Sequence, residues 1–230
     1  MKPAVRLEMP NTDRVIAVLA EGIRRFAPQV VVESGTFLGT GSTRIIIRAF
    51  AGKLPPKFYS IEVSDQLRRR AMENLSDTPV VECLWGLSIG KEHAREFLLN
   101  DPLLKELDPN LDIYVDFLPD PVGGYLKELD GSMGGEIQGA CPERLLEQLL
   151  EKHRQDRPLI CLDSAGGIGW LEFQEVLRLQ AEYPFLLFLD DINHVKHYRS
   201  KVYVETTPGF EVIGSDLEEG WVVALFSGNC

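Results

Sequence analysis

Short apolar runs alternate with helical segments along most of this 230-residue chain. The apolar runs have the length of strands, and the segments between them repeat apolar residues at helical spacing. Strands and helices in this alternation pair through right-handed crossovers, so we expect an α/β fold with a mostly parallel sheet. The expected strands are residues 30–33, 58–62, 80–85, 159–163 and 185–190, with a closing hairpin of 210–214 and 221–226. The expected helices follow Asp13 and cover about 42–50, 65–75, 89–99, 142–153 and 170–183.

The segment of about 100–141 interrupts this alternation. Residues 112–116 predict an extra short strand, and the glycines after it predict an irregular structure. An insertion of this length is either a disordered surface loop or a lid over a site, and the sequence leaves both open. The chain length suits one α/β domain, so we expect residues 1–230 to form a single domain with this glycine-rich insertion. The glycines are Gly123, Gly124, Gly131, Gly134 and Gly135.

A glycine-rich turn follows the first expected strand and opens the next helix. It runs from Glu33 to Ser42, with the sequence ESGTFLGTGS. Glycines at such a junction permit positive φ values and close approach of a ligand, and the first N–H groups of the helix are unpaired. A carboxylate at Glu33 would repel the pyrophosphate that dinucleotide-binding turns hold, and Arg44 stands where their third glycine is needed. The turn therefore predicts a nucleotide-like cofactor with a cationic end, such as S-adenosylmethionine.

This turn resembles motif I of the class I, Rossmann-like methyltransferases, and the resemblance spans about residues 30–226. It implies a doubly wound, mostly parallel seven-stranded sheet with a C-terminal antiparallel hairpin. It also implies in-line methyl transfer from S-adenosylmethionine, in which the protein mainly aligns the reacting atoms. The turn would hold the methionine end, Glu62 the ribose and Ser88 the adenine. The cofactor-binding residues so predicted are Glu33, Ser34, Gly35, Thr36, Gly39, Gly41, Ser42, Glu62, Val63, Gly86, Ser88 and Asp163.

Three carboxylates lie at the ends of the fourth and fifth expected strands. Asp163 ends one strand, and Asp190 and Asp191 end the other. Carboxylates on one rim repel each other unless a cation lies between them, and Mg²⁺ prefers such oxygen ligands. The same positions look like the metal ligands of catechol-type and cephalosporin-pathway O-methyltransferases, so we predict a Mg²⁺ or similar site and a catalytic Asp163. The alternative is that the aspartates only cap a helix and order a loop.

The general base is not evident at its usual place. The catechol branch has a lysine three residues after the first of these aspartates, and this chain has Gly166 there. The base must then come from elsewhere, and His194, Lys196 and His197 follow the fifth strand as catalytic candidates. Each is also an ordinary polar residue near the start of a helix.

The composition of the chain limits the classes of molecule that it is expected to bind. A net charge of −11 and a pI near 4.9 disfavour a nucleic-acid acceptor. The N-terminal residues lack the apolar core of a signal peptide, and the four cysteines lack metal-site spacing, so we expect a cytoplasmic protein without a membrane partner. The acceptor is expected to be a small molecule, and the sequence does not define the oligomeric state.

The sequence thus predicts an S-adenosylmethionine-dependent methyltransferase that acts on an oxygen of a small molecule, with metal assistance. Two alternatives stay open. An NAD-dependent oxidoreductase would share the fold and the ribose carboxylate, although Glu33 opposes its pyrophosphate. A non-catalytic adenosyl-binding or assembly protein would keep Glu33 and Glu62 and need no carboxylate cluster.

Overall fold

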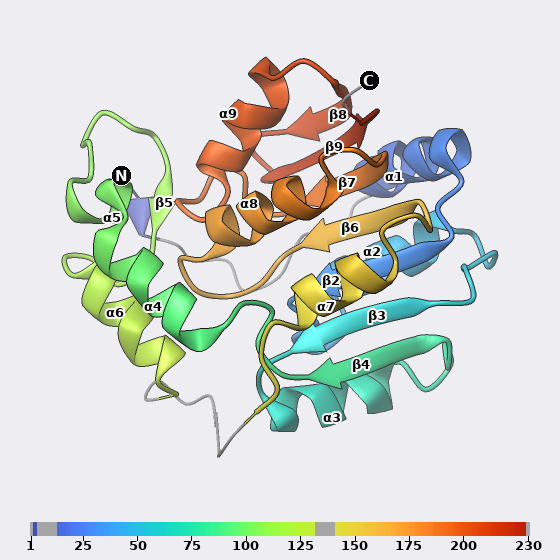
Figure 1. The fold of residues 1–230 in the computed structure, drawn as a ribbon, viewed down its shortest axis with the longest axis horizontal. Helices are drawn as coiled ribbons and strands as arrows, with labels where there is room; N and C mark the ends of the chain where they lie inside the picture. The colour runs from blue at the N-terminus through green and yellow to red at the C-terminus, as the bar shows by residue number, and fades with distance from the viewer. Residues whose placement is uncertain (1, 4–12, 132–140, 229–230) are drawn as a thin grey trace.

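The computed structural model describes residues 2–3, 13–131 and 141–228. A seven-stranded sheet with the order β4-β3-β2-β6-β7-β9-β8 forms the centre of this part (Figure 1). The first five of these strands are parallel, and β9 runs antiparallel between β7 and β8. This confirms the predicted doubly wound sheet with a C-terminal hairpin. The strands are β2 (Val30–Ser34), β3 (Phe58–Glu62), β4 (Val81–Trp85), β6 (Pro158–Leu162), β7 (Phe185–Leu189), β8 (Phe210–Asp216) and β9 (Trp221–Phe226).

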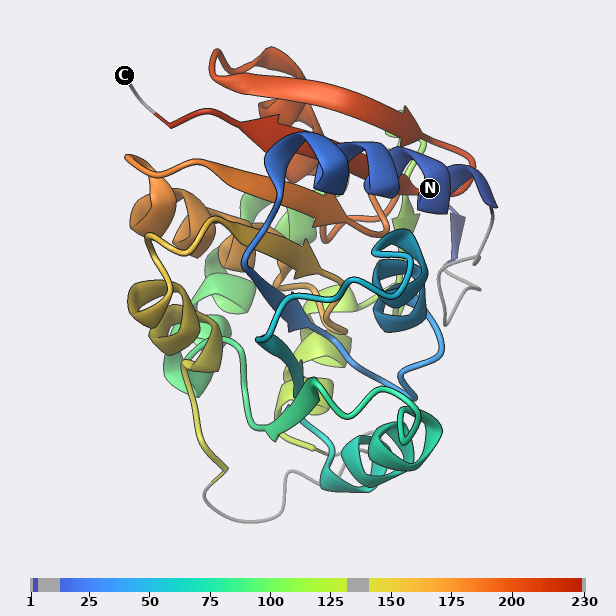
Figure 2. The same ribbon diagram turned by 90° about the vertical axis from the view of Figure 1, so that its right-hand side faces the viewer.

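Helices cover both faces of the sheet, as Figure 2 shows. The first three pack on one face, α7 to α9 pack on the other, and α4 to α6 lie beyond the carboxyl ends of the strands (Figure 1). The helices are α1 (Asp13–Phe26), α2 (Ser42–Ala49), α3 (Asp65–Asn74), α4 (Lys91–Asn100), α5 (Pro102–Lys105), α6 (Pro121–Leu129), α7 (Leu145–Lys152), α8 (Gly169–Gln180) and α9 (Tyr198–Thr206). No helix in the described residues is long and apolar enough to cross a bilayer.

The sheet separates two apolar cores because strand side chains alternate between its faces. In β2, Val30 and Val32 belong to one core and Val31 to the other, and all three are fully buried. A strand that is apolar on both faces can lie only in the middle of a covered sheet. This places the turn after β2 at the centre of the carboxyl edge.

The insertion is more regular than its glycines predicted. Its described part contains α5, α6 and the strand β5 (Tyr114–Val115), so the prediction of irregular structure around Gly123 and Gly124 is wrong. Both glycines lie in α6, where Asp120 caps the helix by accepting from the Gly123 N–H at 2.9 Å and Pro121 follows at the first turn. A Cβ on Gly124 would lie 2.2 Å from Phe117, so this glycine permits close packing. Gly134 and Gly135 lie outside the described residues.

The extra strand expected at 112–116 is confirmed in part by β5. It pairs in parallel with β1 (Lys2–Pro3), and Tyr114 also bridges to His194 in the loop after β7. One helix begins later than expected: α7 starts at Leu145 because Arg144 adopts a left-handed conformation with φ of 62°. The insertion therefore returns to the carboxyl edge of the sheet and contacts it through β5.

Candidate functional site

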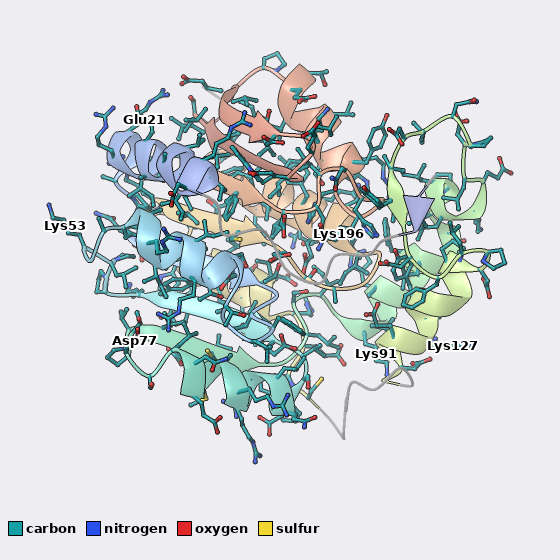
Figure 3. The ribbon with its side chains drawn as sticks, turned by 180° about the vertical axis from the view of Figure 1, so that it is seen from behind. Glu21, Lys53, Asp77, Lys91, Lys127 and Lys196 are labelled. Atoms are coloured by element: carbon teal, nitrogen blue, oxygen red, sulfur yellow. The ribbon has the colours of Figure 1, made fainter. Side chains whose placement is uncertain are left out.

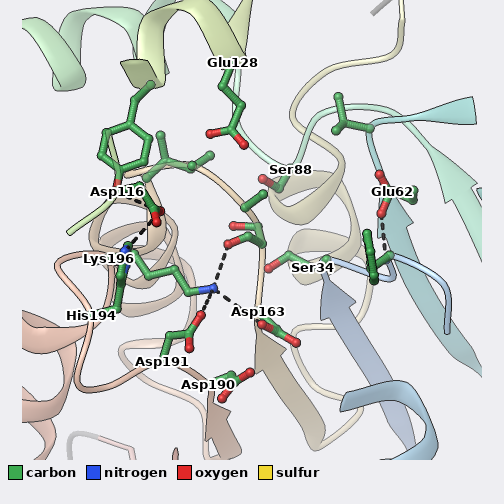
Figure 4. Close-up of a pocket in the computed structure, with 18 of the residues that line it drawn as sticks. Ser34, Glu62, Ser88, Asp116, Glu128, Asp163, Asp190, Asp191, His194 and Lys196 are labelled. Carbon is green, nitrogen blue, oxygen red and sulfur yellow. Dashed lines mark hydrogen bonds and ion pairs between the residues drawn. The ribbon is translucent and has the colours of Figure 1, made fainter. Parts of the chain in front are cut away.

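A cavity of about 980 Å³ opens at the carboxyl ends of the parallel strands (Figure 4). It lies where the strand order reverses between β2 and β6, which is the point where open α/β sheets bind ligands. Its volume is at the upper end of the range of about 300–1,000 Å³ for small-molecule pockets. One part of its lining comes from the segments after β2, β3 and β4, and the other from β5, α6 and the loops after β6 and β7.

Most of the residues predicted for the site line this cavity. Three do not: Glu33, Gly39 and His197. Those that do are Ser34, Gly35, Thr36, Gly41, Ser42, Glu62, Val63, Gly86, Ser88, Asp163, Asp190, Asp191, His194 and Lys196.

Gly35 allows the two central loops to meet. Its φ is +90°, and a Cβ there would lie 2.2 Å from the carbonyl oxygen of Asp163. Any other residue would force apart the turn after β2 and the loop after β6. By contrast, Gly39, with φ of +69°, faces the flexible side chain of Leu75 and does not line the cavity.

Glu33 lies beneath the cavity and is fully buried. Its carboxylate accepts hydrogen bonds from the hydroxyls of Ser42 at 2.8 Å, Thr43 at 2.8 Å and Ser60 at 2.5 Å. Burial raises the pKa of Glu33 to about 7, although these hydroxyls act in the opposite direction. Glu33 therefore fastens the start of α2 to β2 and β3 and is not positioned to contact a ligand in the cavity.

Glu62, in contrast, presents its carboxylate to the cavity. Figure 4 shows this side chain among the residues that line the cavity. Its Oε2 accepts from the Phe37 N–H at 2.7 Å and its Oε1 from the Ser64 N–H at 2.9 Å. Each carboxylate oxygen has a second lone pair, so a pair of ligand hydroxyls can still donate to Glu62. The predicted contact of Glu62 with a ribose needs two acceptor positions of this kind, and it stays a prediction.

Glu172 connects three serines of the cavity from below. It is fully buried in α8 and accepts from Ser164 Oγ at 2.7 Å and Ser34 Oγ at 3.2 Å, and it also bonds Ser88. Burial raises the pKa of this carboxyl group. The sequence did not reveal Glu172, because a glutamate inside an expected helix looks like a surface residue.

The three aspartates come together as predicted, with ligand atoms of Asp163, Asp190 and Asp191 within 4.8 Å of one another. Burial raises the pKa of Asp163 and of Asp190, and at Asp190 the two other carboxylates act in the same direction. The side chain of Lys196 reaches into this cluster (Figure 4). Its Nζ lies 2.8 Å from Asp191 Oδ2 and 3.5 Å from Asp163 Oδ1, and it donates to the Ser164 carbonyl oxygen at 3.0 Å.

The position of Lys196 conflicts with the predicted divalent cation. The three carboxylates are oxygen donors of the kind that Mg²⁺ prefers, at about 2.0–2.1 Å. A metal bound through the Asp191 oxygen that Lys196 contacts would lie within about 5 Å of the ammonium nitrogen, where the two cations repel by several kcal/mol at an effective dielectric constant of about 20. While Lys196 lies here, the cluster does not fit a resident divalent cation.

The two histidines have different surroundings. His194 lines the cavity: its Nδ1 accepts from the Lys196 N–H at 3.2 Å, and its Nε2 lies 3.2 Å from Asp116 Oδ2. His197 is fully buried away from the cavity, with Nδ1 3.1 Å from Ser200 Oγ. Burial and the charge of Lys196 lower the pKa of His197 well below its ordinary value. His197 is therefore not positioned to act on a ligand in the cavity.

The insertion also lines the cavity, and three of its polar side chains there, those of Asp116, Tyr125 and Glu128, were not predicted from the sequence. Asp116 follows β5 and accepts from the Tyr125 hydroxyl at 3.3 Å. Burial acts to raise the pKa of Asp116, but His194, the Tyr125 hydroxyl and Lys196 together lower it below its ordinary value. Glu128 lies on α6 one turn after Tyr125, and its Oε2 is buried without a hydrogen-bond partner in the described part of the chain. Burial raises the pKa of Glu128. Recognition of α6 as a helix would have placed Tyr125 and Glu128 on one face.

Comparisons with known proteins agree on the fold. No family model and no curated protein matches the sequence. Cofactor-bound Rv0187 from MTB is 15% identical, with 99% of this chain and 84% of that chain covered and a TM-score of 0.51. An O-methyltransferase from Bacillus cereus in complex with SAH is 12% identical, with 98% and 84% covered and a TM-score of 0.51. A putative O-methyltransferase from Klebsiella pneumoniae is 15% identical, with 99% and 84% covered and a TM-score of 0.50.

We expect the buried Glu33 carboxyl to make stability depend on pH. The pKa of Glu33 is about 7 in the folded protein, against an ordinary 4.5. Its contribution to the free energy of unfolding is therefore fully present below pH 4.5 and is lost as the pH rises through 7. This loss amounts to about 3 kcal/mol. The glutamine side chain of Glu33→Gln cannot ionise. The difference in free energy of unfolding between the variant and the wild type should therefore shift in favour of the variant by about 3 kcal/mol between pH 4.5 and 7. Urea denaturation at several pH values measures the difference, with the exposed Glu82→Gln as control. A difference that is constant with pH would contradict this account of Glu33.

Proposed function

We propose that this chain is an S-adenosylmethionine-dependent methyltransferase that transfers a methyl group to an oxygen of a small-molecule acceptor. The observation that carries the proposal is Glu62, whose two anchored oxygens face a cavity at the switch point beside the glycine turn. The shared fold supports it, because a Bacillus cereus O-methyltransferase of the same fold is solved in complex with SAH. The preference for an oxygen acceptor rests on such neighbours and on the resemblance in the sequence.

The cofactor fits the part of the cavity next to β2, β3 and β4. We assign the ribose hydroxyls to Glu62, the adenine to the segment around Ser88, and the methionine carboxylate to the unpaired N–H groups at the start of α2. Since Glu33 lies beneath the cavity, we assign the cationic end of S-adenosylmethionine to the carboxylate of Asp163. The close approach of Gly35 to the Asp163 backbone places this aspartate beside the turn after β2.

The acceptor fits the part lined by β5, α6 and the loop after β7. In-line transfer moves the methyl group from sulfur to the acceptor oxygen, leaves S-adenosylhomocysteine and releases the hydroxyl proton. We assign that proton to Glu128, because its Oε2 has no partner in the described residues and its raised pKa makes it a stronger base than an ordinary carboxylate. Both ring nitrogens of His194 already have neighbours, and Lys196 is paired with aspartates. Metal assistance is not part of this proposal, since Lys196 already lies in the cluster.

The charge of the cavity disfavours the oxidoreductase alternative. Lys196 is the only lysine or arginine among the described residues that line the cavity, whereas seven lining residues carry carboxyl groups. A pyrophosphate would meet repulsion from most sides of such a cavity. The seven are Glu62, Asp116, Glu128, Asp163, Asp190, Asp191 and Glu218.

Ligand-induced thermal stabilisation separates the candidate functions. We expect S-adenosylhomocysteine to raise the melting temperature and NAD to leave it unchanged. Glu62→Gln should weaken S-adenosylhomocysteine binding at least about tenfold, because hydrogen bonds to a charged group contribute roughly 1.5–3 kcal/mol. Glu82→Gln, an exposed glutamate on the adjacent strand, is the matched control. Stabilisation by NAD alone, or equal affinity in both variants, would exclude the proposed cofactor site.

Transfer itself tests Glu128. A screen of hydroxylated small molecules with S-adenosylmethionine as donor identifies an acceptor by the formation of S-adenosylhomocysteine. With that acceptor, Glu128→Gln should lower kcat by about 10²-fold or more while S-adenosylhomocysteine affinity stays unchanged, since loss of a general base costs about 10²–10⁴. Glu92→Gln on the exposed side of α4 is the control. A kcat of Glu128→Gln near the wild-type value would exclude Glu128 as the general base. If wild type transfers a methyl group to none of the acceptors, the result favours the non-catalytic alternative.

A further inference from the structure

Lys196 is an unusually enclosed lysine. Only 5% of the residue is exposed, whereas Lys53 is an exposed lysine; Figure 3 shows both positions. An ammonium group has three N–H donors, and three oxygens surround this one, from Asp191, Asp163 and Ser164. The donors of Lys196 are therefore fully used by the protein itself.

The backbone around Lys196 is held in place from two directions. The Lys196 N–H donates to His194 Nδ1 at 3.2 Å, and the preceding Val195 N–H donates to the Tyr114 carbonyl of β5 at 3.0 Å. Tyr114 in turn donates to the Asn193 carbonyl at 2.8 Å. Val195 itself is 1% exposed, so the segment is packed as well as hydrogen-bonded. The ammonium group is consequently preorganised between the carboxylates and is not a side chain that swings in from solvent.

Two consequences follow for its chemistry. A lysine acts as a general base only after it loses a proton, and here three oxygens hold all three protons. A divalent cation would have to share the same aspartate oxygens with a fixed positive charge. The geometry thus opposes both the catalytic-base role and the metal site that the sequence predicted for this region.

We propose that Lys196 is a resident cation that takes the place of a divalent metal at Asp163, Asp190 and Asp191. The proposal rests on the proposed function. Methyl transfer in this chain then proceeds without a metal, and the acceptor needs no pair of adjacent hydroxyls to chelate one. A single hydroxyl group that reaches the methyl group is sufficient. Removal of the ammonium group leaves three carboxylates within bonding range of a common ion, so the metal site is latent and Lys196 blocks it.

Mn²⁺ binding to the full chain tests this proposal, measured by titration calorimetry and by the electron paramagnetic resonance of free Mn²⁺. Wild type should show no stoichiometric binding at millimolar Mn²⁺. Lys196→Met, which keeps the unbranched side chain and removes the charge, should bind one ion with a Kd at least tenfold below the highest Mn²⁺ concentration at which wild type shows no binding. Lys196→Arg should bind none, because it keeps the charge. Lys201→Met, on the neighbouring helix α9, is the control and should match wild type.

Two results would overturn the proposal. One is stoichiometric Mn²⁺ binding by wild type that Asp163→Asn abolishes. The other is the absence of Mn²⁺ binding in both Lys196→Met and a second neutral variant, Lys196→Gln. If one neutral variant fails to fold, the other decides. S-adenosylhomocysteine affinity is measured on the same samples. Failure of the proposed function appears as lack of S-adenosylhomocysteine binding in wild type. Failure of this proposal appears, with that affinity intact, as Mn²⁺ binding by wild type or as no Mn²⁺ binding by the neutral variants.

Discussion

The close approach of the Asp163 backbone to Gly35 is the contact on which the site depends. The Asp163 N–H donates to the Ser34 carbonyl at 3.0 Å, and a Cβ on Gly35 would meet the Asp163 carbonyl at 2.2 Å. Because β2 and β6 are neighbours whose following segments diverge to opposite faces, a cavity opens between them. The contact sets how far Asp163 stands from the turn, and with it the distance between the cofactor part and the aspartate cluster.

The buried carboxylates near this contact have partners that compensate their charge. Glu33 is held by hydroxyls, Glu62 by backbone N–H groups and the aspartate cluster by Lys196. Glu172 is held by serines. Burial of a charge is costly unless such partners are present. Glu128 differs, since no hydrogen bond to its carboxylate is found among the described residues and its Oε2 is buried without a partner, whereas Glu172 has an unpartnered Oε1 but is held through Oε2. The uncompensated carboxylate lies on the part of the cavity that we assign to the acceptor, where a ligand hydroxyl can supply the missing donor.

The sequence was sufficient to predict the features that follow from the order of strands and helices along the chain. Apolar runs and their alternation with helices were sufficient for the sheet, and the ends of parallel strands meet at one edge, so Glu62 and the aspartates could be placed at the cavity. It could not show contacts between distant segments. One such contact is the hydrogen bond that the Ser60 hydroxyl of β3 donates to the Glu33 carboxylate. Another is the backbone hydrogen bond from Val195 to Tyr114 of β5, which positions the loop that carries Lys196. Glu128 was missed because Gly123 and Gly124 suggested a loop, whereas Asp120 and the packing of Phe117 make the segment helical.

A crystal structure of the protein with S-adenosylhomocysteine, grown in millimolar MnCl₂, tests the central claim most directly. We predict the ribose hydroxyls on Glu62 and the homocysteine end between the glycine turn and Asp163. We also predict Lys196 Nζ among the aspartates, and no anomalous difference peak at the cluster. A ligand bound elsewhere, or an ordered Mn²⁺ ion on Asp163, Asp190 and Asp191 with Lys196 displaced, would contradict the account.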